Sequence, residues 1–345
     1  MALPLKILIV DDSALVRQSL ARIINHDKSL EVSAVASDPF VAVKKIAACK
    51  PDIITLDIEM PKMDGLTFLR KIMSQHPMPV VVISSLTKKG SDLAIKAMEY
   101  GAVDVVQKSN LSVDSFEDNE RDILEVIKAA GQSRIKRKKV ETALPIEPNH
   151  VEGLTTTNKI IAVGASTGGT EAIKSFLDQM PIDCPGIVIV QHMPELFTKS
   201  FAERLDSILK VQVREAKDGD TILRGLVLIA PGNKHMEVKK TGTRYYIKLS
   251  DGERVNRHKP SVDILFHSMA KNVGENATGV ILTGMGADGA KGILAMKNAG
   301  SYTLGQNEET CIVYGMPKEA KRLGGINKEV ALSKIGKEAV SSLKY

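Results

Sequence analysis

Short apolar runs alternate with helical patterns along the first 130 residues. The runs occupy positions 7–10, 32–36, 53–56, 80–83 and 103–106. Strands that alternate with helices in this way are typical of a parallel sheet covered by helices on both faces. The pattern therefore predicts a doubly wound α/β domain, whose ligands bind beyond the carboxyl ends of the strands.

The second half of the chain repeats this pattern. Apolar runs at 160–163, 187–190, 226–229 and 280–282 predict further strands, and the runs 236–239 and 245–249 around Gly242 predict a hairpin. We expect a second doubly wound α/β domain here.

The segment between the two halves, residues 131–158, has a different composition. It contains five basic residues within 134–139, followed by two prolines and three consecutive threonines. We interpret it as a linker between a domain at 1–130 and a domain at 159–345. The basic run could bind nucleic acid or an anionic surface, although a short charged connector usually stays solvated.

Composition and charge narrow the possible classes of protein. A chain of 345 residues with 43% apolar and 26% charged residues suits two ordinary globular domains. The net charge of +6 arises in residues 159–345, which hold 26 basic and 20 acidic side chains, so an acidic partner surface and a solvated lysine-rich face both remain open. The absence of Trp and the few aromatic residues argue against base stacking.

Targeting signals and cysteine patterns add little to this description. The N-terminus has no charged region followed by a long apolar stretch, and no run approaches eighteen apolar residues, so we expect a cytoplasmic protein without membrane insertion. Cys49, Cys184 and Cys311 are isolated, which predicts small buried side chains rather than disulfides or metal ligands.

Acidic side chains follow two of the predicted strands in the first half. Asp11 and Asp12 come after the first strand and Asp57 after the third, while Ser84 ends the fourth and Lys108 follows the fifth. Clustered carboxylates repel one another unless a cation holds them, and their oxygens suit Mg²⁺. An aspartate in such a pocket can attack a phosphoryl donor, with the metal and the lysine offsetting the transferred charge.

The stretch K-P-D-I-I-T-L-D-I-E-M-P at 50–61, with Asp64-Gly65, resembles the receiver domain of bacterial response regulators over about residues 5–128. The resemblance implies a flavodoxin-like fold and phosphorylation of Asp57 by a histidine kinase. It also implies that Asp11, Asp12 and Asp57 hold Mg²⁺, and that Ser84 and Lys108 sense the phosphoryl group.

Two positions depart from the receiver pattern. Ser109 stands where proline usually follows the lysine, and Val105 occupies the position of the usual aromatic switch residue. An aromatic-rotamer signal is therefore not expected in its usual form.

A glycine-flanked serine follows the first strand of the second half. Ser166 lies in the G-x-S-x-G pattern of residues 164–168, where a sharp turn exposes a short side chain and the next helix offers backbone N–H groups. His192 and Asp288 also follow predicted strands, so the three side chains can meet above one sheet. We expect His192 to take the Ser166 proton and Asp288 to orient His192, with N–H groups at 167–169 and at Met285 receiving the oxyanion.

Each part of this site has an alternative interpretation. A histidine after a strand is often structural, and a glycine-rich turn often binds phosphate or a dinucleotide. The dinucleotide alternative is weakened because Ser166 replaces the second glycine and the next strand ends at His192 rather than at an acidic residue. The chain order Ser, His, Asp also differs from that of α/β-hydrolases.

Residues 159–343 closely resemble the methylesterase domain of the CheB chemotaxis family. The resemblance rests on the motifs at 163–169, 191–194, 230–236, 258–263, 283–289 and 314–317. It implies a Rossmann-like catalytic domain that hydrolyses glutamate γ-methyl esters and deamidates certain glutamines on the cytoplasmic domains of chemoreceptors, without a cofactor. Ser166, His192 and Asp288 match the triad of the family, Thr167 lies beside the histidine, and Met285 matches its oxyanion position.

A second group of polar residues invites comparison with the triad. We interpret Pro260, Ser261 and Asp263 as capping residues of a helix rather than as a second site with His258, and we expect His267 to be packed.

The sequence therefore predicts a response regulator whose output is a serine esterase, in which phosphorylation of the receiver by the chemotaxis kinase relieves a block on Ser166. Two alternatives remain from other classes. A DNA-binding regulator requires a helix-turn-helix, which the second half lacks, and a nonenzymatic adaptor requires loss of a triad member.

Overall fold

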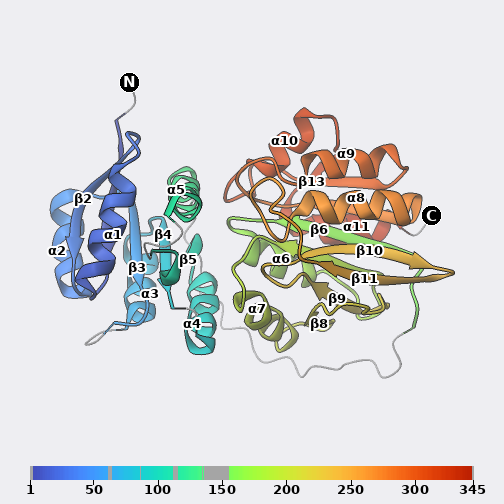
Figure 1. Ribbon diagram of the computed structural model, residues 1–345, viewed down its shortest axis with the longest axis horizontal. Helices are drawn as coiled ribbons and strands as arrows, with labels where there is room; N and C mark the ends of the chain where they lie inside the picture. Colours follow the sequence, from blue (N-terminus) through green and yellow to red (C-terminus); the bar gives the residue numbers. More distant parts are fainter. Residues whose placement is uncertain are drawn as a thin grey trace. The chain divides into compact units, whose positions relative to one another are not determined.

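The computed structural model describes residues 3–60, 64–85, 87–111, 116–133, 135 and 155–343. The chain divides into two compact units at residues 142 and 143 (Figure 1), within the segment interpreted as a linker. The structure describes only Ile135 of the basic run at 134–139. The possible binding role of this run therefore lies outside the described residues.

The N-terminal unit is a doubly wound domain, as predicted. Within its described residues, five parallel strands form one sheet in the order β2-β1-β3-β4-β5. The strands are β1 (Leu5–Val10), β2 (Leu30–Ala36), β3 (Ile53–Asp57), β4 (Val80–Ser84) and β5 (Asp104–Gln107). The helices are α1 (Ala14–Asn25), α2 (Pro39–Cys49), α3 (Gly65–Gln75), α4 (Lys88–Glu99), the 3-10 turn η1 (Lys108–Leu111) and α5 (Phe116–Gln132). α1 contacts α5, and α3 contacts α4.

Local sequence explains where several of these helices begin. Ser13, Asp38, Asp64 and Thr87 precede α1, α2, α3 and α4, and each side chain accepts a hydrogen bond from a backbone N–H of the first turn. Such caps satisfy donors that have no partner inside the helix. The strands β3 and β4 are buried along their whole length, as expected for a sheet with helices on both faces.

The C-terminal unit contains a larger parallel sheet. Among its described residues, seven strands lie in the order β14-β13-β12-β6-β7-β9-β8. They are β6 (Ile160–Ala165), β7 (Gly186–Gln191), β8 (Gln212–Glu215), β9 (Leu226–Ile229), β12 (Ala277–Ile281), β13 (Tyr302–Gln306) and β14 (Lys328–Val330). The sequence pattern missed β8, β13 and β14. β8 and β14 are short and lie at the two ends of the sheet, whereas β13 lies inside it.

The predicted hairpin is also present in this unit. It consists of β10 (His235–Thr241) and β11 (Arg244–Ser250), and β10 contacts α8 (Val262–Asn272). The other helices are α6 (Gly169–Leu177), α7 (Phe197–Asp206), η3 (Gly274–Asn276), α9 (Ala290–Asn298), α10 (Met316–Arg322) and α11 (Leu332–Ser341). The apolar core joins β6, β7, β9 and β12 to α8, α9 and the hairpin.

The strand order places a reversal of the chain between β6 and β12. From β6 the sheet grows through β7 and β9 on one side, and it returns to add β12 and β13 on the other side. Ligands of doubly wound proteins bind at such a reversal, beyond the carboxyl ends of the strands. The functional site is therefore expected above β6, β7 and β12.

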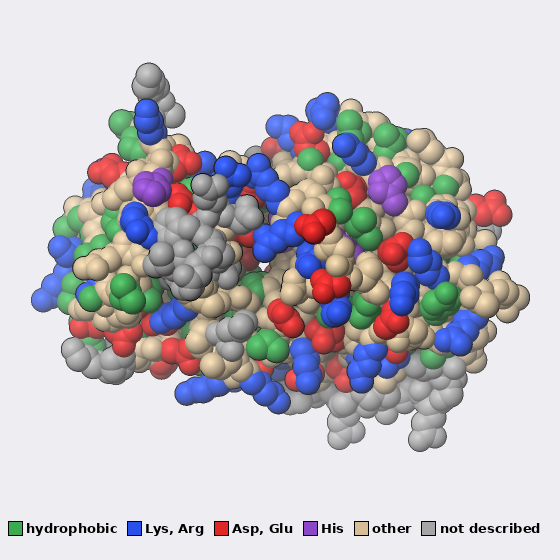
Figure 2. Space-filling view, viewed as in Figure 1, with side chains coloured by type: hydrophobic (Ala, Val, Ile, Leu, Met, Phe, Trp, Pro, Cys, Tyr) green, Lys and Arg blue, Asp and Glu red, His purple; other side chains and the backbone are tan. Residues whose placement is uncertain are grey.

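Other features bear on the sequence-based expectations. Cys184 and Cys311 are buried, whereas Cys49 is only partly so. No helix within the described part of the chain is both long and apolar enough to span a bilayer. On the visible face of the C-terminal unit, basic and acidic side chains are interspersed (Figure 2), so that face has no broad surface of one charge.

Candidate active site and phosphoacceptor site

The three predicted catalytic residues lie at the carboxyl ends of β6, β7 and β12. Ser166 directly follows β6 and His192 directly follows β7, while Asp288 ends the glycine-rich loop between β12 and α9. Backbone hydrogen bonds tie the loops together: Ser166 N–H donates to Thr283 O at 3.1 Å, and His192 N–H donates to Ala165 O at 3.1 Å. The sheet edge thus holds segments that are far apart in sequence.

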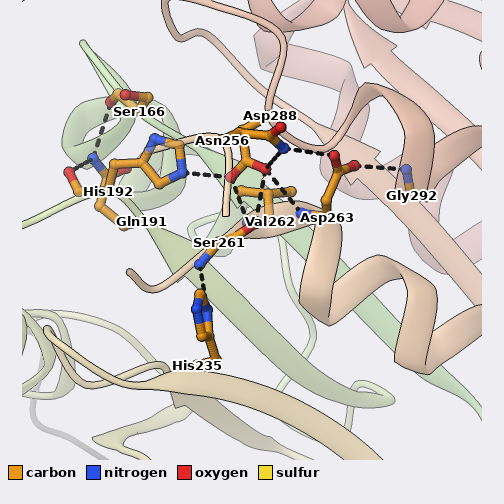
Figure 3. A network of polar contacts seen from close by, with 10 residues as sticks. All are labelled: Ser166, Gln191, His192, His235, Asn256, Ser261, Val262, Asp263, Asp288 and Gly292. Carbon is orange, nitrogen blue, oxygen red and sulfur yellow. Dashed lines mark hydrogen bonds and ion pairs between the residues drawn. The ribbon is translucent and has the colours of Figure 1, made fainter. Parts of the chain in front are cut away.

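The histidine and the aspartate are joined directly. His192 Nε2 lies 2.8 Å from Asp288 Oδ2, and the two side chains are only 8% and 1% exposed. If Nε2 donates this hydrogen bond, Nδ1 carries the lone pair and can accept a proton. Nδ1 is on the side of the ring toward Ser166 (Figure 3) and has no hydrogen-bond partner among the described residues.

Asp288 is held by a dense set of donors. Its carboxylate accepts hydrogen bonds from Asn256 Nδ2, Ser261 Oγ and the backbone N–H groups of Val262 and Asp263, in addition to His192. Burial alone would raise the pKa of Asp288, but these hydrogen bonds and the nearby histidine outweigh it and hold the pKa below its ordinary value. The carboxylate therefore remains ionised beside His192.

The interpretation of Ser261 and Pro260 as capping residues was wrong in its details. Ser261 occupies the position before α8, but its side chain makes no capping bond and instead donates to Asp288. Asp288 itself accepts the first N–H groups of α8, so a distant residue caps the helix. Pro260 lies before the helix rather than inside it.

The histidines outside the triad also differ from expectation. His258 stacks on His192, with ring centroids 3.6 Å apart and planes 16° apart, which sequence reasoning missed. His267 is exposed on α8, so the prediction that it is packed was wrong.

Asn256 was missed altogether. Its signal in the sequence is an asparagine in a short charged stretch between two elements, where asparagine tolerates a left-handed turn conformation.

The glycines around Ser166 explain how closely its neighbours approach. A Cβ on Gly284 would lie 2.8 Å from Ser166 Cβ, and a Cβ on Gly169 would lie 2.0 Å from Gln191 Oε1. Gly169 N–H donates to Ser166 O at 2.6 Å, so it closes the turn instead of remaining available for an oxyanion. Thr167 is buried beside this turn and Met285 lies in the adjoining loop, and their roles stay predictions.

The acidic residues of the N-terminal unit form a second site. One ligand atom from each of Asp11, Asp12 and Asp57 lies within 4.8 Å of the others. Lys108 Nζ lies 2.6 Å from Asp57 Oδ2 and 3.4 Å from Asp11 Oδ2. Burial, and next the charge of Asp57, raise the pKa of Asp11 to about 6. Clustered carboxylates that repel one another fit a divalent cation such as Mg²⁺.

Ser84 lies at this edge of the sheet, whereas Val105 lies near the start of β5. Ser84 is buried at the end of β4 and donates its hydroxyl hydrogen bond to Gly90 O at 3.0 Å. Val105 is buried in β5. Lys108 reaches Asp57 although Ser109 follows it, so the pocket forms without the usual proline.

Comparison with known proteins identifies the family of the chain. A family model described as CheB methylesterase matches residues 161–339, and one described as the response regulator receiver domain matches residues 7–115. The chain belongs to the CheB methylesterase family. The resemblance noted from the sequence, and the α/β folds that it implied, are thereby confirmed.

Individual relatives agree with this assignment. The chain is 51% identical to protein-glutamate methylesterase/protein-glutamine glutaminase 3 of Geobacter metallireducens, over 97% of this chain and 98% of that protein. It is 48% identical to a protein of the same name, numbered 2, from Rhizobium johnstonii, over 99% and 98%. The solved CheB methylesterase catalytic domain of Thermotoga maritima is 37% identical and covers 53% of this chain and 97% of that chain, with a TM-score of 0.52.

Proposed function

We propose that this protein is a phosphorylation-controlled protein-glutamate methylesterase and protein-glutamine glutaminase that acts on the cytoplasmic domains of chemoreceptors during chemotactic adaptation. The observation that carries the proposal is the buried pair of His192 and Asp288 beside Ser166, on a fold whose relatives bear that activity in their names.

The first half of the reaction forms an acyl-enzyme. Ser166 Oγ attacks the carbonyl carbon of the methyl ester while His192 Nδ1 takes the hydroxyl proton, and ionised Asp288 stabilises the imidazolium. The N–H groups of Thr167 and Met285 are proposed to receive the oxyanion. When the tetrahedral intermediate collapses, His192 returns the proton to the methoxy oxygen and methanol leaves.

The second half regenerates the enzyme. A water molecule gives a proton to His192 and attacks the acyl carbon, and the protonated histidine then returns a proton to Ser166 Oγ as glutamate is released. The same steps on a glutamine side chain release ammonia. We propose that the esterase uses no cofactor, because each proton and charge in this sequence is handled by Ser166, His192, Asp288 or backbone N–H groups.

The N-terminal unit is proposed to control this reaction. Asp57 accepts a phosphoryl group from the chemotaxis histidine kinase, and Asp11, Asp12 and Asp57 would hold the Mg²⁺ that offsets phosphoryl charge. Lys108 already contacts Asp57 and is placed to bind the transferred group, whereas Ser84 must turn its hydroxyl away from Gly90 O to do so.

The organisation of the chain follows from this assignment. We propose a receiver at 1–130, a linker at 131–158 and a catalytic domain at 159–345, in a cytoplasmic protein that binds receptors and the kinase and needs neither nucleic acid nor membrane insertion.

The unphosphorylated receiver restricts the access of receptors to Ser166. A truncated protein that begins at Gly153 should then exceed the activity of the unphosphorylated whole chain, and equal activity would contradict this mode of control.

The central experiment measures methanol released from a methylated chemoreceptor, with and without a small-molecule phosphodonor. Wild-type protein should release methanol faster with the donor. Ser166→Ala should release none while Asp57 still becomes phosphorylated, and substantial residual turnover would contradict the proposal.

A gel-shift assay at stated salt tests the DNA-binding alternative, which requires retardation of promoter fragments.

A further inference from the structure

The segment 253–261 lies against His192 and Asp288. One buried side chain, that of His235, forms hydrogen bonds with both ends of the segment. His235 is 3% exposed, and its Nε2 lies 2.8 Å from Glu253 O. Its Nδ1 accepts a hydrogen bond from Ser261 N–H at 3.2 Å. The backbone donor requires an unprotonated Nδ1, so Nε2 carries the hydrogen that Glu253 O accepts. One imidazole thus anchors the start and the end of the segment.

The tip of the segment is a two-residue hairpin turn. Val255 and His258 exchange both backbone hydrogen bonds, at 3.1 and 2.9 Å. The residues between them, Asn256 and Arg257, have φ values of 50° and 69°. Positive φ at both central positions is the mark of a type I′ turn, which glycine normally occupies at the second position. An arginine at a positive φ carries backbone strain, and strain of this kind persists where the surrounding structure requires the conformation.

The turn places the side-chain amide of Asn256 between two carboxylates. Asn256 Nδ2 lies 2.7 Å from Asp288 Oδ1 and 2.7 Å from Asp263 Oδ2 (Figure 3), so each of its two hydrogens has an acceptor. Asp263 is fixed in turn by Gly292 N–H, at 2.6 Å. Asn256 shares Oδ1 of Asp288 with Ser261 Oγ and the Asp263 N–H. With Oδ1 held in this way, Oδ2 stays directed at His192 and the Val262 N–H.

The turn also places His258 against one face of the His192 imidazole. The stacked rings, 3.6 Å apart, leave that face of His192 covered. Burial, and next the charge of a protonated His192, lower the pKa of His258 to about 3. His258 is therefore a flat, uncharged cover at neutral pH. It restricts rotation of the His192 ring and keeps water from one face.

We propose that the turn at 255–258 positions the catalytic triad: Asn256 orients the Asp288 carboxylate, and His258 fixes the ring plane of His192 so that Nδ1 faces Ser166. Neither residue touches the reacting atoms, so both are positioning residues. This inference rests on the proposed esterase function, because it concerns the same three catalytic side chains.

The test compares four variants of the full-length protein, activated by a phosphodonor and assayed by methanol release from methylated receptor. Asn256→Ala removes the amide, His258→Ala removes the ring, and His258→Phe keeps a flat ring. Asn272→Ala is the matched control, because Asn272 Nδ2 also donates two hydrogen bonds, to Val238 O and Ser268 O at the far end of α8.

We expect Asn256→Ala and His258→Ala to lower kcat by about tenfold or more with KM changed by less than about twofold, the pattern for lost transition-state geometry. His258→Phe should stay within about threefold of wild type. Asn272→Ala should lower only the melting temperature.

Two outcomes would overturn the inference. If Asn256→Ala and His258→Ala behave like Asn272→Ala, losing stability but not kcat, their role is structural only. If His258→Phe is as slow as His258→Ala, a flat ring is not what the site requires.

A substrate-free measurement separates this inference from the proposed function. The downfield proton signal of His192 Nε2–H should be sharp in wild type and broadened or shifted in Asn256→Ala and His258→Ala. A signal unchanged in both variants would contradict the positioning role. Wild-type protein that releases no methanol would instead overturn the esterase function and leave this signal as the test of positioning.

Discussion

Asp288 Oδ2 lies 2.8 Å from His192 Nε2 and 2.7 Å from the first backbone N–H of α8, that of Val262. One carboxylate therefore holds His192, the proposed catalytic base, and caps a helix of the core. A negative charge at a helix N-terminus stabilises the helix, and the same charge stabilises an imidazolium. In the proposed mechanism, catalysis and folding are coupled through this side chain.

This double role separates Asp288 from Ser166 in a mutational test. Asp288→Ala should lower kcat by about 10³-fold or more, because His192 loses its orientation, and should lower the free energy of unfolding by about 2 kcal/mol, because buried N–H groups lose their acceptor. Ser166→Ala should abolish turnover with stability changed by less than about 0.5 kcal/mol. Methanol release and denaturant unfolding measure the two quantities. An Asp288→Ala protein as stable as Ser166→Ala would contradict the capping role.

A methyl group at Gly284 should damage the site without adding strain to the backbone. Its Cβ would lie 2.3 Å from Met316 Sδ and 2.8 Å from Ser166 Cβ, so Ser166 must shift. We expect Gly284→Ala to lower kcat by about 10²-fold, since a displacement of about 1 Å has effects of that size. Gly324→Ala is the control: it has φ of 80° and nothing within 4 Å of its Cβ, so it should cost about 1 kcal/mol of stability and no activity. Equal activity in both variants would contradict the expected displacement.

The partly buried His258 should make the protein less stable in acid. Its pKa is lowered from 6.5 to about 3, chiefly by burial. Above pH 6.5 residue 258 is neutral in both states and has no effect. Between pH 6.5 and 3, the imidazole of His258 is protonated in the unfolded chain but stays neutral in the folded chain. The free energy of unfolding therefore falls as the pH falls, by at most about 1.4 kcal/mol per pH unit.

The measurement is denaturant unfolding followed by circular dichroism at pH 7.5 and pH 5. Wild type should lose about 1 to 2 kcal/mol more than His258→Phe over this interval, because phenylalanine does not titrate. Equal losses in the two proteins would show that His258 binds its proton as readily folded as unfolded.

Removing divalent cations should affect the receiver but not the serine. With EDTA, Asp57 should no longer be phosphorylated by a small-molecule donor, because Asp11, Asp12 and Asp57 repel an incoming phosphoryl group unless a cation offsets their charge. Methanol release should fall to the unphosphorylated rate. Labelling of Ser166 by a fluorophosphonate should be unchanged, and loss of labelling on adding EDTA would contradict a metal-free esterase site.

Much of the architecture could be predicted from the sequence because each buried strand of a parallel sheet is a short apolar run. β6 and β7 are buried on both faces, so their positions are apolar or small except Gln191 at the end of β7, and such runs stand out between helical patterns. β14, with three residues and a position at the end of its sheet, has no such requirement and was missed. The residues just past the strands were predictable for the same reason, since parallel strands bring their carboxyl ends to one edge.

The sequence alone determined the two α/β domains, the family, and the residue types at the strand ends, from Asp57 to Ser166, His192 and Asp288. Only the tertiary structure decided which of these side chains hold one another. Asn256 lies 32 positions from Asp288, in a turn whose conformation no pattern of polarity encodes, and His258 from the same turn stacks on His192. Periodicity records which face of an element is buried, whereas contacts between loops depend on where the whole sheet brings them.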